Sequence, residues 1–139
     1  MKLNLEEIQL INIFERITRA TVKDFFELNQ LVFIVDESEV GKVIGKKGSN
    51  LKRMESLLKK KIKIVGFNKD PIKFLKNYVN PLILKSVNLE KDILKISADR
   101  KTKGLLIGRN HKNLEVLKEL FKRHFKLEIM LKWVKNQMD

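Results

Sequence analysis

The stretch of the chain best suited to a chemical role is Gly45-Lys46-Lys47-Gly48, in which two glycines enclose two lysines. Glycine has no Cβ atom, so the backbone at both positions can approach a bulky group closely. The lysines add positive charge, and a helix that begins after the turn would direct free N–H groups toward the same place. These residue types at this spacing predict a site that binds phosphate groups.

The residues on either side of the turn predict two helices. An apolar pair, Val43 and Ile44, closes a short helix expected over residues 39–44. After the turn, a second helix is expected over residues 50–59, because its apolar residues recur at helical spacing. These apolar residues are Leu51, Met54, Leu57 and Leu58. The basic Lys52 would point away from this apolar face.

A second copy of this stretch lies further along the chain, at one constant offset. Gly108 stands at the position that corresponds to Gly45, and Asn113 at the position that corresponds to Asn50. The other matching positions are Asp36 with Asp99, Gly41 with Gly104, Ile44 with Ile107, Leu51 with Leu114, Met54 with Leu117, and Leu57 with Leu120. Matches of this number at one offset indicate an internal repeat.

The second turn reads Gly108-Arg109-Asn110-His111, so a histidine stands where the first turn has its second glycine. Asparagine and histidine tolerate a positive φ better than most residues, but histidine still adopts it at a cost. Two interpretations are open at this point. Either the second turn keeps its shape with strain, or it holds a phosphate group less closely. Arg109 and Lys112 supply positive charge in both cases.

The expected helices and strands follow the same order on both sides of residue 67. The first half is expected to hold a helix from Asn4 to Thr18 and strands over residues 21–26, 31–35 and 61–65. The second half is expected to hold a helix that begins at Asp70-Pro71, helices over residues 101–107 and after residue 112, and strands over residues 83–89, 92–98 and 127–131. Its closing strand requires an additional shift of two residues. We therefore expect an α+β protein of two αββααβ modules, residues 1–66 and 67–139, each with a three-stranded sheet packed against helices.

The chain carries a large excess of positive charge. Its 139 residues include 30 lysines and arginines against 17 aspartates and glutamates, which gives a formal net charge of +13. Residues 37–66 hold 9 basic and 3 acidic side chains, and residues 101–139 hold 10 and 4. The charge is thus concentrated around the two copies of the turn. Such a distribution favours an anionic partner, either a nucleic acid or a membrane surface.

Several other classes of function are not expected from this composition. The sequence has no run of 18 apolar residues and no basic amphipathic helix with an aromatic face, so no membrane association is expected. No signal-peptide pattern is present, which favours a cytoplasmic location. The absence of cysteine excludes disulfides and thiolate metal sites. With two histidines, no metal-ligand spacing and no nucleophile motif, we expect neither a cofactor nor an enzyme.

The sequence Val-Ile-Gly-Lys-Lys-Gly at positions 43–48, between two helices and behind a pair of strands, resembles the signature of a KH domain. The helix-first, strand-last order of the modules is similar to the type II KH fold. With two such modules, the chain as a whole resembles the archaeal NusA-like transcription factors, which are little more than two fused KH domains. The resemblance also includes Val32-Phe33-Ile34-Val35, Asp70-Pro71 and Gly104-Leu105-Leu106-Ile107-Gly108, and it covers nearly the whole chain.

This resemblance implies that each turn contacts the sugar-phosphate backbone of about four nucleotides of single-stranded RNA. It implies two sets of RNA-binding residues. They are Ile44, Gly45, Lys46, Lys47, Gly48, Asn50, Leu51 and Lys52 in the first module, and Gly108, Arg109, Asn110, His111, Lys112 and Asn113 in the second. It further implies a monomer that binds nascent RNA during transcription elongation or termination, with RNA polymerase as a second partner.

Alternatives exist for the process and for individual residues. The same turns would serve a KH protein of ribosome assembly or RNA processing, and their sequence does not separate these processes from transcription. A KH fold that binds other proteins and no RNA is a further alternative. For Ile44 and Leu51 the competing interpretation is packing in the core, and for Lys52 it is a solvated helix face.

Overall fold

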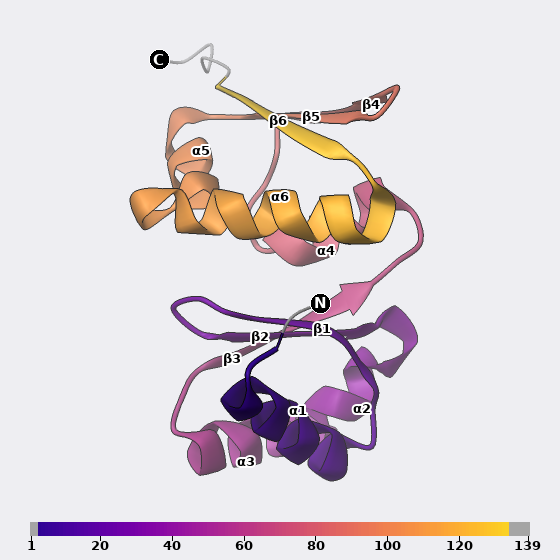
Figure 1. The fold of residues 1–139 in the computed structure, drawn as a ribbon, viewed down its shortest axis with the longest axis vertical. Helices are drawn as coiled ribbons and strands as arrows, with labels where there is room; N and C mark the ends of the chain where they lie inside the picture. The colour runs from indigo at the N-terminus through magenta and orange to yellow at the C-terminus, as the bar shows by residue number, and fades with distance from the viewer. Residues whose placement is uncertain (1–2, 134–139) are drawn as a thin grey trace. The chain divides into compact units, whose positions relative to one another are not determined.

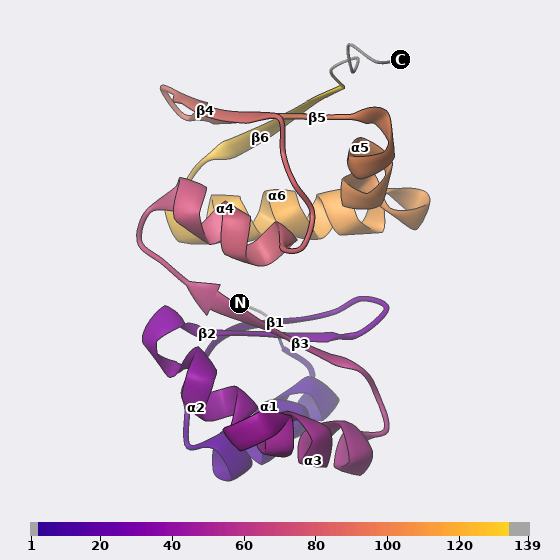
Figure 2. The same cartoon turned by 180° about the vertical axis from the view of Figure 1, so that it is seen from behind.

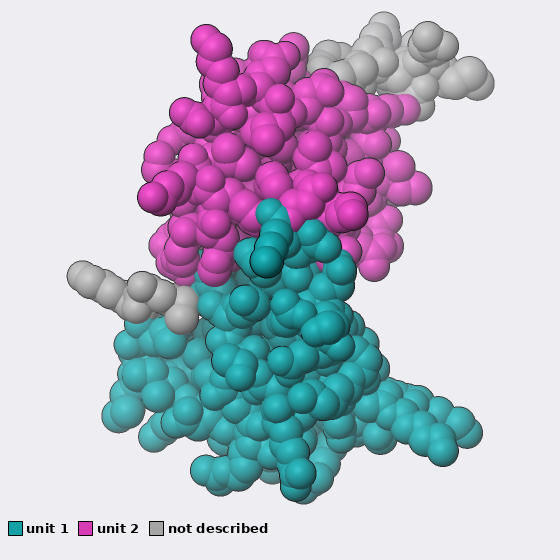
Figure 3. Space-filling view, turned by 90° about the vertical axis from the view of Figure 1, so that its right-hand side faces the viewer, with its two compact units in different colours: residues 1–69 teal, residues 70–139 magenta. Residues whose placement is uncertain are grey.

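The structure is a computed structural model that describes residues 3–133. Each half of the chain forms a three-stranded sheet packed against helices (Figure 1), which confirms the predicted fold class. The chain divides into two compact units, residues 1–69 and residues 70–139, shown in different colours in Figure 3. The elements of both units occur in the order helix, strand, strand, helix, helix, strand.

The first unit has its three helices on one face of its sheet, as Figures 1 and 2 show from opposite sides. Its elements are α1 (Leu5–Thr18), β1 (Val22–Glu27), β2 (Leu31–Asp36), α2 (Val40–Ile44), α3 (Ser49–Leu58) and β3 (Ile62–Phe67). The strand order is β1-β2-β3, with β1 antiparallel and β3 parallel to the central β2. Residues 31–35 of β2 are all buried, as befits the central strand.

The core of the first unit lies between this sheet and its helices. The rings of Phe14 in α1 and Phe33 in β2 are stacked with their centroids 4.0 Å apart, and both side chains are fully buried. Val43 of α2 and Met54 of α3 belong to the same cluster. Each fully buried side chain of this size contributes about 2 kcal/mol through removal of apolar surface from water. Burial of Val43 and Met54 therefore fixes the two helices that enclose the glycine turn.

The second unit repeats this arrangement. Its elements are α4 (Pro71–Val79), β4 (Ser86–Glu90), β5 (Ile93–Ala98), α5 (Arg100–Ile107), α6 (Lys112–Phe125) and β6 (Glu128–Trp133). The strand order is β4-β5-β6, with β4 antiparallel and β6 parallel to β5. Leu106 of α5 and Leu117 of α6 are buried and fix the helices on either side of the second turn.

The predicted starts of the two opening helices are confirmed. The Asn4 side chain accepts a hydrogen bond of 2.8 Å from the Glu7 N–H, and the Glu7 carboxylate accepts one of 3.1 Å from the Asn4 N–H. This reciprocal pair is a capping box. At the start of α4, Asp70 accepts a bond of 2.9 Å from the Ile72 N–H, and Pro71 is the first helical residue.

The extent of the first strand in the second unit was predicted wrongly. We expected a strand from residue 83, but β4 begins at Ser86. Its ladder with β5 starts where Ser86 lies opposite Ser97, so Ile83 and Leu84 precede the paired residues. The apolar run at 82–84 belongs instead to the connection between α4 and β4.

The size of the shift before the closing strand was also predicted wrongly. Leu31 of β2 lies opposite Ile62, whereas Leu94, its counterpart in the repeat, lies opposite Ile129. Ile62 and Ile129 are 67 positions apart in the sequence, and Leu31 and Leu94 are 63 positions apart. The closing strand is therefore shifted by four positions relative to the repeat, where we expected two. The cause is the length of the preceding helix, because α6 has 14 residues and α3 has 10.

Candidate nucleic-acid interface

The first loop, from Gly45 to Gly48, links α2 to α3. Gly45 ends α2 with a φ of +79°, and its N–H donates to the Gly41 carbonyl over 3.0 Å. The Gly48 N–H donates back to the Gly45 carbonyl over 3.1 Å, which closes a single tight turn. Lys46 and Lys47 are exposed on this turn. The loop thus presents two cations on a backbone that is fixed by its own hydrogen bonds.

The second loop, from Gly108 to His111, has nearly the same backbone as the first. Gly108 has φ and ψ of 73° and 176°, and Gly45 has 79° and 172°. His111 has 61° and 16°, and Gly48 has 73° and 18°. The second loop therefore keeps its shape, with a histidine in the left-handed region, as the first of the two interpretations proposed.

The third position of each loop is left-handed as well. Lys47 has φ and ψ of 54° and 30°, and Asn110 has 55° and 28°. A side chain in this region costs about 1–2 kcal/mol, and asparagine adopts it more readily than lysine does. Asn110 is therefore less strained than Lys47, and this offsets part of the conformational strain that His111 adds in place of a glycine.

The first glycine of each loop is required by its surroundings. A Cβ atom on Gly45 would lie 3.0 Å from the side-chain amide of Asn50, and one on Gly108 would lie 2.5 Å from that of Asn113. The two asparagines come this close because they bond to the helix before the loop. Nδ2 of Asn50 donates to the carbonyl of residue 42 over 3.1 Å, and Nδ2 of Asn113 donates to the carbonyl of residue 105 over 3.2 Å.

These two bonds define what Asn50 and Asn113 do. The carbonyls that they reach lie near the end of a helix, where no later N–H of that helix is in place to donate to them. Each asparagine therefore joins the helix before its loop to the helix after it. We predicted both residues as RNA-binding, and the structure places their amides in bonds within the chain. Their contribution to a bound ligand would come through the position of the loop.

The fourth position of each loop is sterically open. A Cβ atom on Gly48 would meet only the Lys52 side chain, at 4.0 Å. A side chain is therefore disfavoured at this position by the positive φ alone and not by lack of space. This explains how His111 can occupy the matching position of the second loop, where its side chain is exposed.

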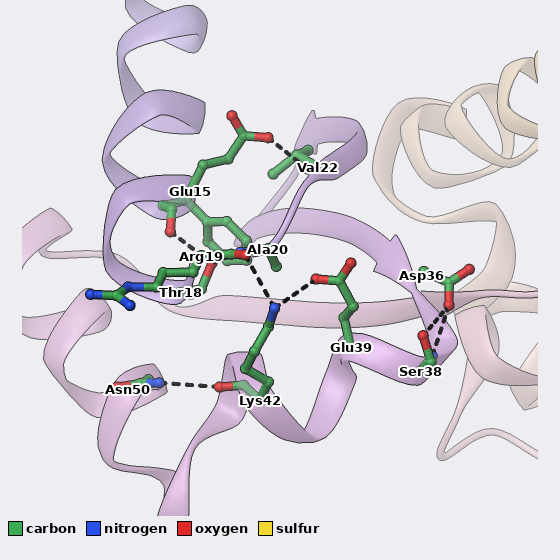
Figure 4. A network of polar contacts seen from close by, with 11 residues as sticks. Glu15, Thr18, Arg19, Ala20, Val22, Asp36, Ser38, Glu39, Lys42 and Asn50 are labelled. Carbon is green, nitrogen blue, oxygen red and sulfur yellow. Dashed lines mark hydrogen bonds and ion pairs between the residues drawn. The ribbon is translucent and has the colours of Figure 1, made fainter.

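In the first unit, a network of polar contacts also joins α2 to the end of α1 (Figure 4). Nζ of Lys42 donates to the Arg19 carbonyl over 3.1 Å and lies 3.3 Å from Oε2 of Glu39. The carbonyl of the same lysine accepts the bond from Asn50. Sequence reasoning did not select Lys42, because its partner Arg19 lies far from it in the sequence. The matching residue of the second unit is the exposed Leu105, so the second unit has no lysine at this position.

The helices that follow the loops start without a capping side chain. Asn4, Asp70 and Asp99 accept hydrogen bonds from the first-turn N–H groups of α1, α4 and α5. By contrast, α3 and α6 begin after Gly48 and His111, and neither of these residues forms a side-chain cap. The Ser49 N–H donates to the Lys46 carbonyl and the Lys112 N–H donates to the Arg109 carbonyl. The later N–H groups of those first turns carry partial positive charge and can bond to an anionic ligand.

Asp36 and Asp99 stand at equivalent places, at the start of the helical segment before each loop. The side-chain hydroxyl and the N–H of Ser38 bond to Asp36, and these bonds lower the pKa of that carboxyl group. The N–H of Thr102 donates to Asp99 over 2.7 Å, and hydrogen bonding from Thr102 lowers the pKa of Asp99. Both carboxyl groups therefore stay ionised at a lower pH than ordinary aspartates do.

The predicted RNA-binding residues fall into an exposed group and a half-buried group. The exposed ones are Lys46, Lys47, Lys52, Arg109, Asn110, His111 and Lys112. The half-buried ones are Ile44, Gly45, Gly48, Asn50, Leu51, Gly108 and Asn113. Leu51 packs against the core of the first unit, as the competing interpretation had it. Within each unit, the structure brings the residues of the loop together with the first turn of the next helix.

Neither a cluster of metal ligands nor a membrane-spanning helix is found in the part of the chain that the structure describes. Residues 3–133 contain no group of three or more histidine, cysteine, aspartate or glutamate side chains placed to hold a metal ion. Within the same residues, no helix combines the length and the apolar character that crossing a membrane requires.

Known proteins resemble this chain in sequence and in structure. The sequence pattern of the KH domain family matches residues 10–91. A protein of Methanocaldococcus jannaschii named "Probable transcription termination protein NusA" is 34% identical over 142 residues, which covers 99% of this chain and 78% of that protein. A protein of the same name from Methanococcus vannielii is 32% identical over 120 residues, covering 83% of this chain and 69% of its own length.

Among solved structures, the crystal structure of APE1850 matches with a TM-score of 0.65 and 27% sequence identity, covering 94% of this chain and 100% of that one. KH domains are nucleic-acid-binding modules that use a Gly-x-x-Gly loop between two helices. Such a loop is present in the first unit and has a counterpart in the second. In both, the N–H of the fourth loop residue donates to the carbonyl of the first. The chain therefore belongs to the KH domain family and, within it, to the archaeal NusA-like proteins.

Proposed function

We propose that the chain binds single-stranded RNA by contacting its sugar-phosphate backbone with both loops. The observation that carries this proposal is that two loops of different sequence share one backbone and lead into helices with uncapped first turns. Exposed cations flank this backbone in both units, namely Lys46 and Lys47 in the first and Arg109 and Lys112 in the second. A KH loop of this kind holds about four unpaired nucleotides.

The residues of the first loop would have separate tasks in binding. The first-turn N–H groups of α3 would donate to phosphate oxygens in charge-assisted hydrogen bonds. Lys46 and Lys47 would attract the strand over a longer range, and added salt would weaken this attraction. Asn50 would act indirectly by holding the loop against α2. Ile44, half-buried at the end of α2, would offer an aliphatic surface to a base.

The second loop would bind through a different set of side chains on the same backbone. Arg109 can form two parallel hydrogen bonds with a phosphate group, which a lysine cannot do. Asn110 and His111 add donors at the two positions where the first loop has Lys47 and Gly48. Residues 108–111 hold one permanent cation, Arg109, where residues 45–48 hold two, so the second loop itself would contribute fewer long-range charges and more directed hydrogen bonds.

A reversal of charge in the first loop tests the proposal. Lys46→Asp combined with Lys47→Asp should weaken binding of single-stranded RNA by at least about tenfold, because two attractive contacts become repulsive. Fluorescence anisotropy with a labelled RNA, selected by the wild-type chain from a random pool, provides the measurement. The matched control is Lys59→Asp with Lys61→Asp, which changes the net charge of the unit equally at the other end of α3. Equal affinities of the two variants would contradict the proposal. A wild-type chain that enriches no RNA from the pool would favour a module that binds proteins only.

We extend the proposal to the process that the names of the relatives indicate. Nascent RNA would be the ligand, and the chain would act in transcription elongation or termination as a monomer with RNA polymerase as a partner. A tagged chain purified from its native cells should then recover RNA polymerase together with RNA. Recovery of ribosomal subunits or processing enzymes without the polymerase would contradict this part and favour ribosome assembly or RNA processing.

A further inference from the structure

The connection between α4 and β4 has no counterpart in the first unit. There, α1 and β1 are joined by three residues, 19–21, of which Ala20 is buried and bonded to the Thr18 hydroxyl. In the second unit the opening helix is shorter, with nine residues against fourteen, and six residues, 80–85, lead to the strand. The internal repeat is broken at this place, and the added chain forms a surface that the first unit lacks.

This connection lines an open pocket of about 500 Å³ together with α4 and the start of β4. We call it the connection pocket. Its apolar lining comes from Ile72, Val79, Leu82, Leu84 and Val87, all of them buried or half-buried. The volume lies in the range of pockets that accept a small molecule or a few side chains.

The pocket also has an apolar residue at its surface and cations at its rim. The Ile83 side chain is 83% exposed, more than any other large hydrophobic side chain among the residues described. Lys76 and Lys85 line the pocket and are exposed, and no aspartate or glutamate lines it. The connection pocket thus combines an apolar interior with a positively charged rim.

These features favour a peptide over RNA as the occupant. The RNA contacts proposed for the loops depend on first-turn N–H groups beside the cations, and other single-strand binders add aromatic side chains that stack with bases. No aromatic residue lines the pocket, and the connection includes Pro81, which has no N–H. Aliphatic pockets with cationic rims suit apolar peptide side chains flanked by carboxylates, because the potentials of the two surfaces are then complementary.

A second copy of the chain is also disfavoured. Self-association would place a lysine-rimmed pocket against a protein whose net charge is +13. Like charges brought together in this way repel one another and reduce affinity. The charge of the whole chain and the charge of the rim therefore point to a partner with acidic residues.

We propose that the connection pocket binds a short acidic peptide segment of another protein. One aliphatic or aromatic side chain of the segment would enter the apolar interior and contact Ile83. Aspartate or glutamate residues on either side would pair with Lys76 and Lys85. This site is separate from the RNA loops in residues and in chemistry, so the chain would hold an RNA and a protein segment at different places.

A selection of peptides tests this inference without knowledge of the partner. A library of short random peptides displayed on phage is selected against the full chain, and against a Lys76→Glu, Lys85→Glu variant. We expect peptides enriched on the wild type alone to carry net negative charge and at least one large apolar residue. No enrichment over the variant, or enrichment of basic peptides, would overturn the proposal.

Synthetic peptides from the selection then locate the site. Their affinity should fall about tenfold or more in the Lys76→Gln, Lys85→Gln variant and also in the Ile83→Asp variant. Because these side chains are exposed, the variants should keep the fold, which circular dichroism can verify. The Lys46→Asp, Lys47→Asp variant should bind the peptides as the wild type does, and this result is independent of whether the loops bind RNA.

Two further outcomes decide against this occupant. If the pocket variants lose affinity for single-stranded RNA while the peptides bind elsewhere, the pocket belongs to the RNA site and the proposal is wrong. If the chain dimerises and the Ile83→Asp variant is monomeric by analytical ultracentrifugation, a second copy is the occupant. Unchanged RNA affinity and a monomeric wild type are the expected results.

Discussion

The two loops share one backbone conformation, but the steric constraints on their individual residues differ. Gly45 and Gly108 combine a positive φ with close contact to an asparagine, so a side chain there would be strained and would displace that asparagine. Gly48 has a positive φ and open space, and its counterpart is His111. In these two loops, the first glycine is therefore more strongly constrained than the residue at the fourth position.

Substitution of each glycine by alanine tests this difference. Gly45→Ala should lower the affinity for RNA severely and destabilise the fold by about 2 kcal/mol or more, since a strained φ is added to a clash with Asn50. Gly48→Ala should cost only about 1 kcal/mol, because the strained φ is its sole penalty. Thermal unfolding and RNA anisotropy measure both effects. Equal losses in the two variants would show that space around the loop does not distinguish the positions.

The two asparagines provide a second test at the scale of single residues. Asn50→Ala removes the bond to the carbonyl of residue 42 and should destabilise the first unit by about 1 kcal/mol. It should also reduce RNA affinity although the phosphate-binding groups are intact, because the loop is then held less firmly. Asn50→Asp is the informative partner variant, since a carboxylate cannot donate to the carbonyl. If Asn50→Asp binds RNA as well as the wild type, a positioning role for this residue is wrong.

At the scale of elements, the helices before and after the second loop are stabilised differently. Asp99 caps α5, whereas α6 has no capping side chain. The folded-state pKa of Asp99 is depressed, chiefly by the backbone hydrogen bond from Thr102, from its ordinary value of 3.8. The stabilisation from this group is therefore complete above that value and is lost as the pH falls through the lower folded-state pKa.

An Asp99→Asn variant checks the sign of this effect. Asparagine caps helices about as well as aspartate, so near pH 5 the variant should unfold at a temperature close to that of the wild type. On acidification to about pH 2.5 the wild type should lose more thermal stability than the variant, because only the wild type has a carboxyl group to protonate at this cap. Circular dichroism melts at both pH values suffice. Equal losses of thermal stability in the two proteins would show that protonation of Asp99 does not contribute to the destabilisation by acid.

The limits of sequence reasoning are also clearest at the scale of elements. Asn4, Asp70 and Pro71 revealed helix starts because capping depends on nearby residues. Ile83 and Leu84 suggested a strand, but the extent of a strand depends on its partner, and the ladder of β5 starts at Ser86. The difference in length between α3 and α6 was likewise hidden, since a pattern of apolar residues does not fix where a helix ends.

The same distinction applies to the candidate site. The repeat revealed both loops, since glycines, cations and helix spacing are local signals. It did not reveal that the amides of Asn50 and Asn113 are used within the chain, or that Lys42 reaches Arg19. Those contacts join segments that only the folded chain brings together, and no local pattern encodes them.

At the scale of the whole molecule, the phosphate contacts of the loops, and not the net charge of +13, should set the salt dependence of RNA binding. For single strands, each phosphate contact contributes about 0.7 to the slope of log affinity against log salt. Lys46→Gln with Lys47→Gln should therefore reduce the slope by about 1.4. Lys59→Gln with Lys61→Gln should leave the slope unchanged, although this variant has the same net charge as the loop variant. A slope that follows net charge alone would mean that the loops have no special place in binding.

The shared backbone of the two loops has a practical consequence for experiments. Because Lys46-Lys47-Gly48 and Arg109-Asn110-His111 occupy one conformation, they can be exchanged between the units without a change of chain length. In such a chimaera the side-chain chemistry moves and the scaffold does not, so any altered preference for RNA is attributable to three side chains. We expect the exchange to preserve folding, as measured by thermal unfolding, and to transfer each loop's contribution to RNA affinity and to its salt dependence to the other unit. One chain therefore offers two scaffolds of the same loop conformation on which the two loop sequences can be compared.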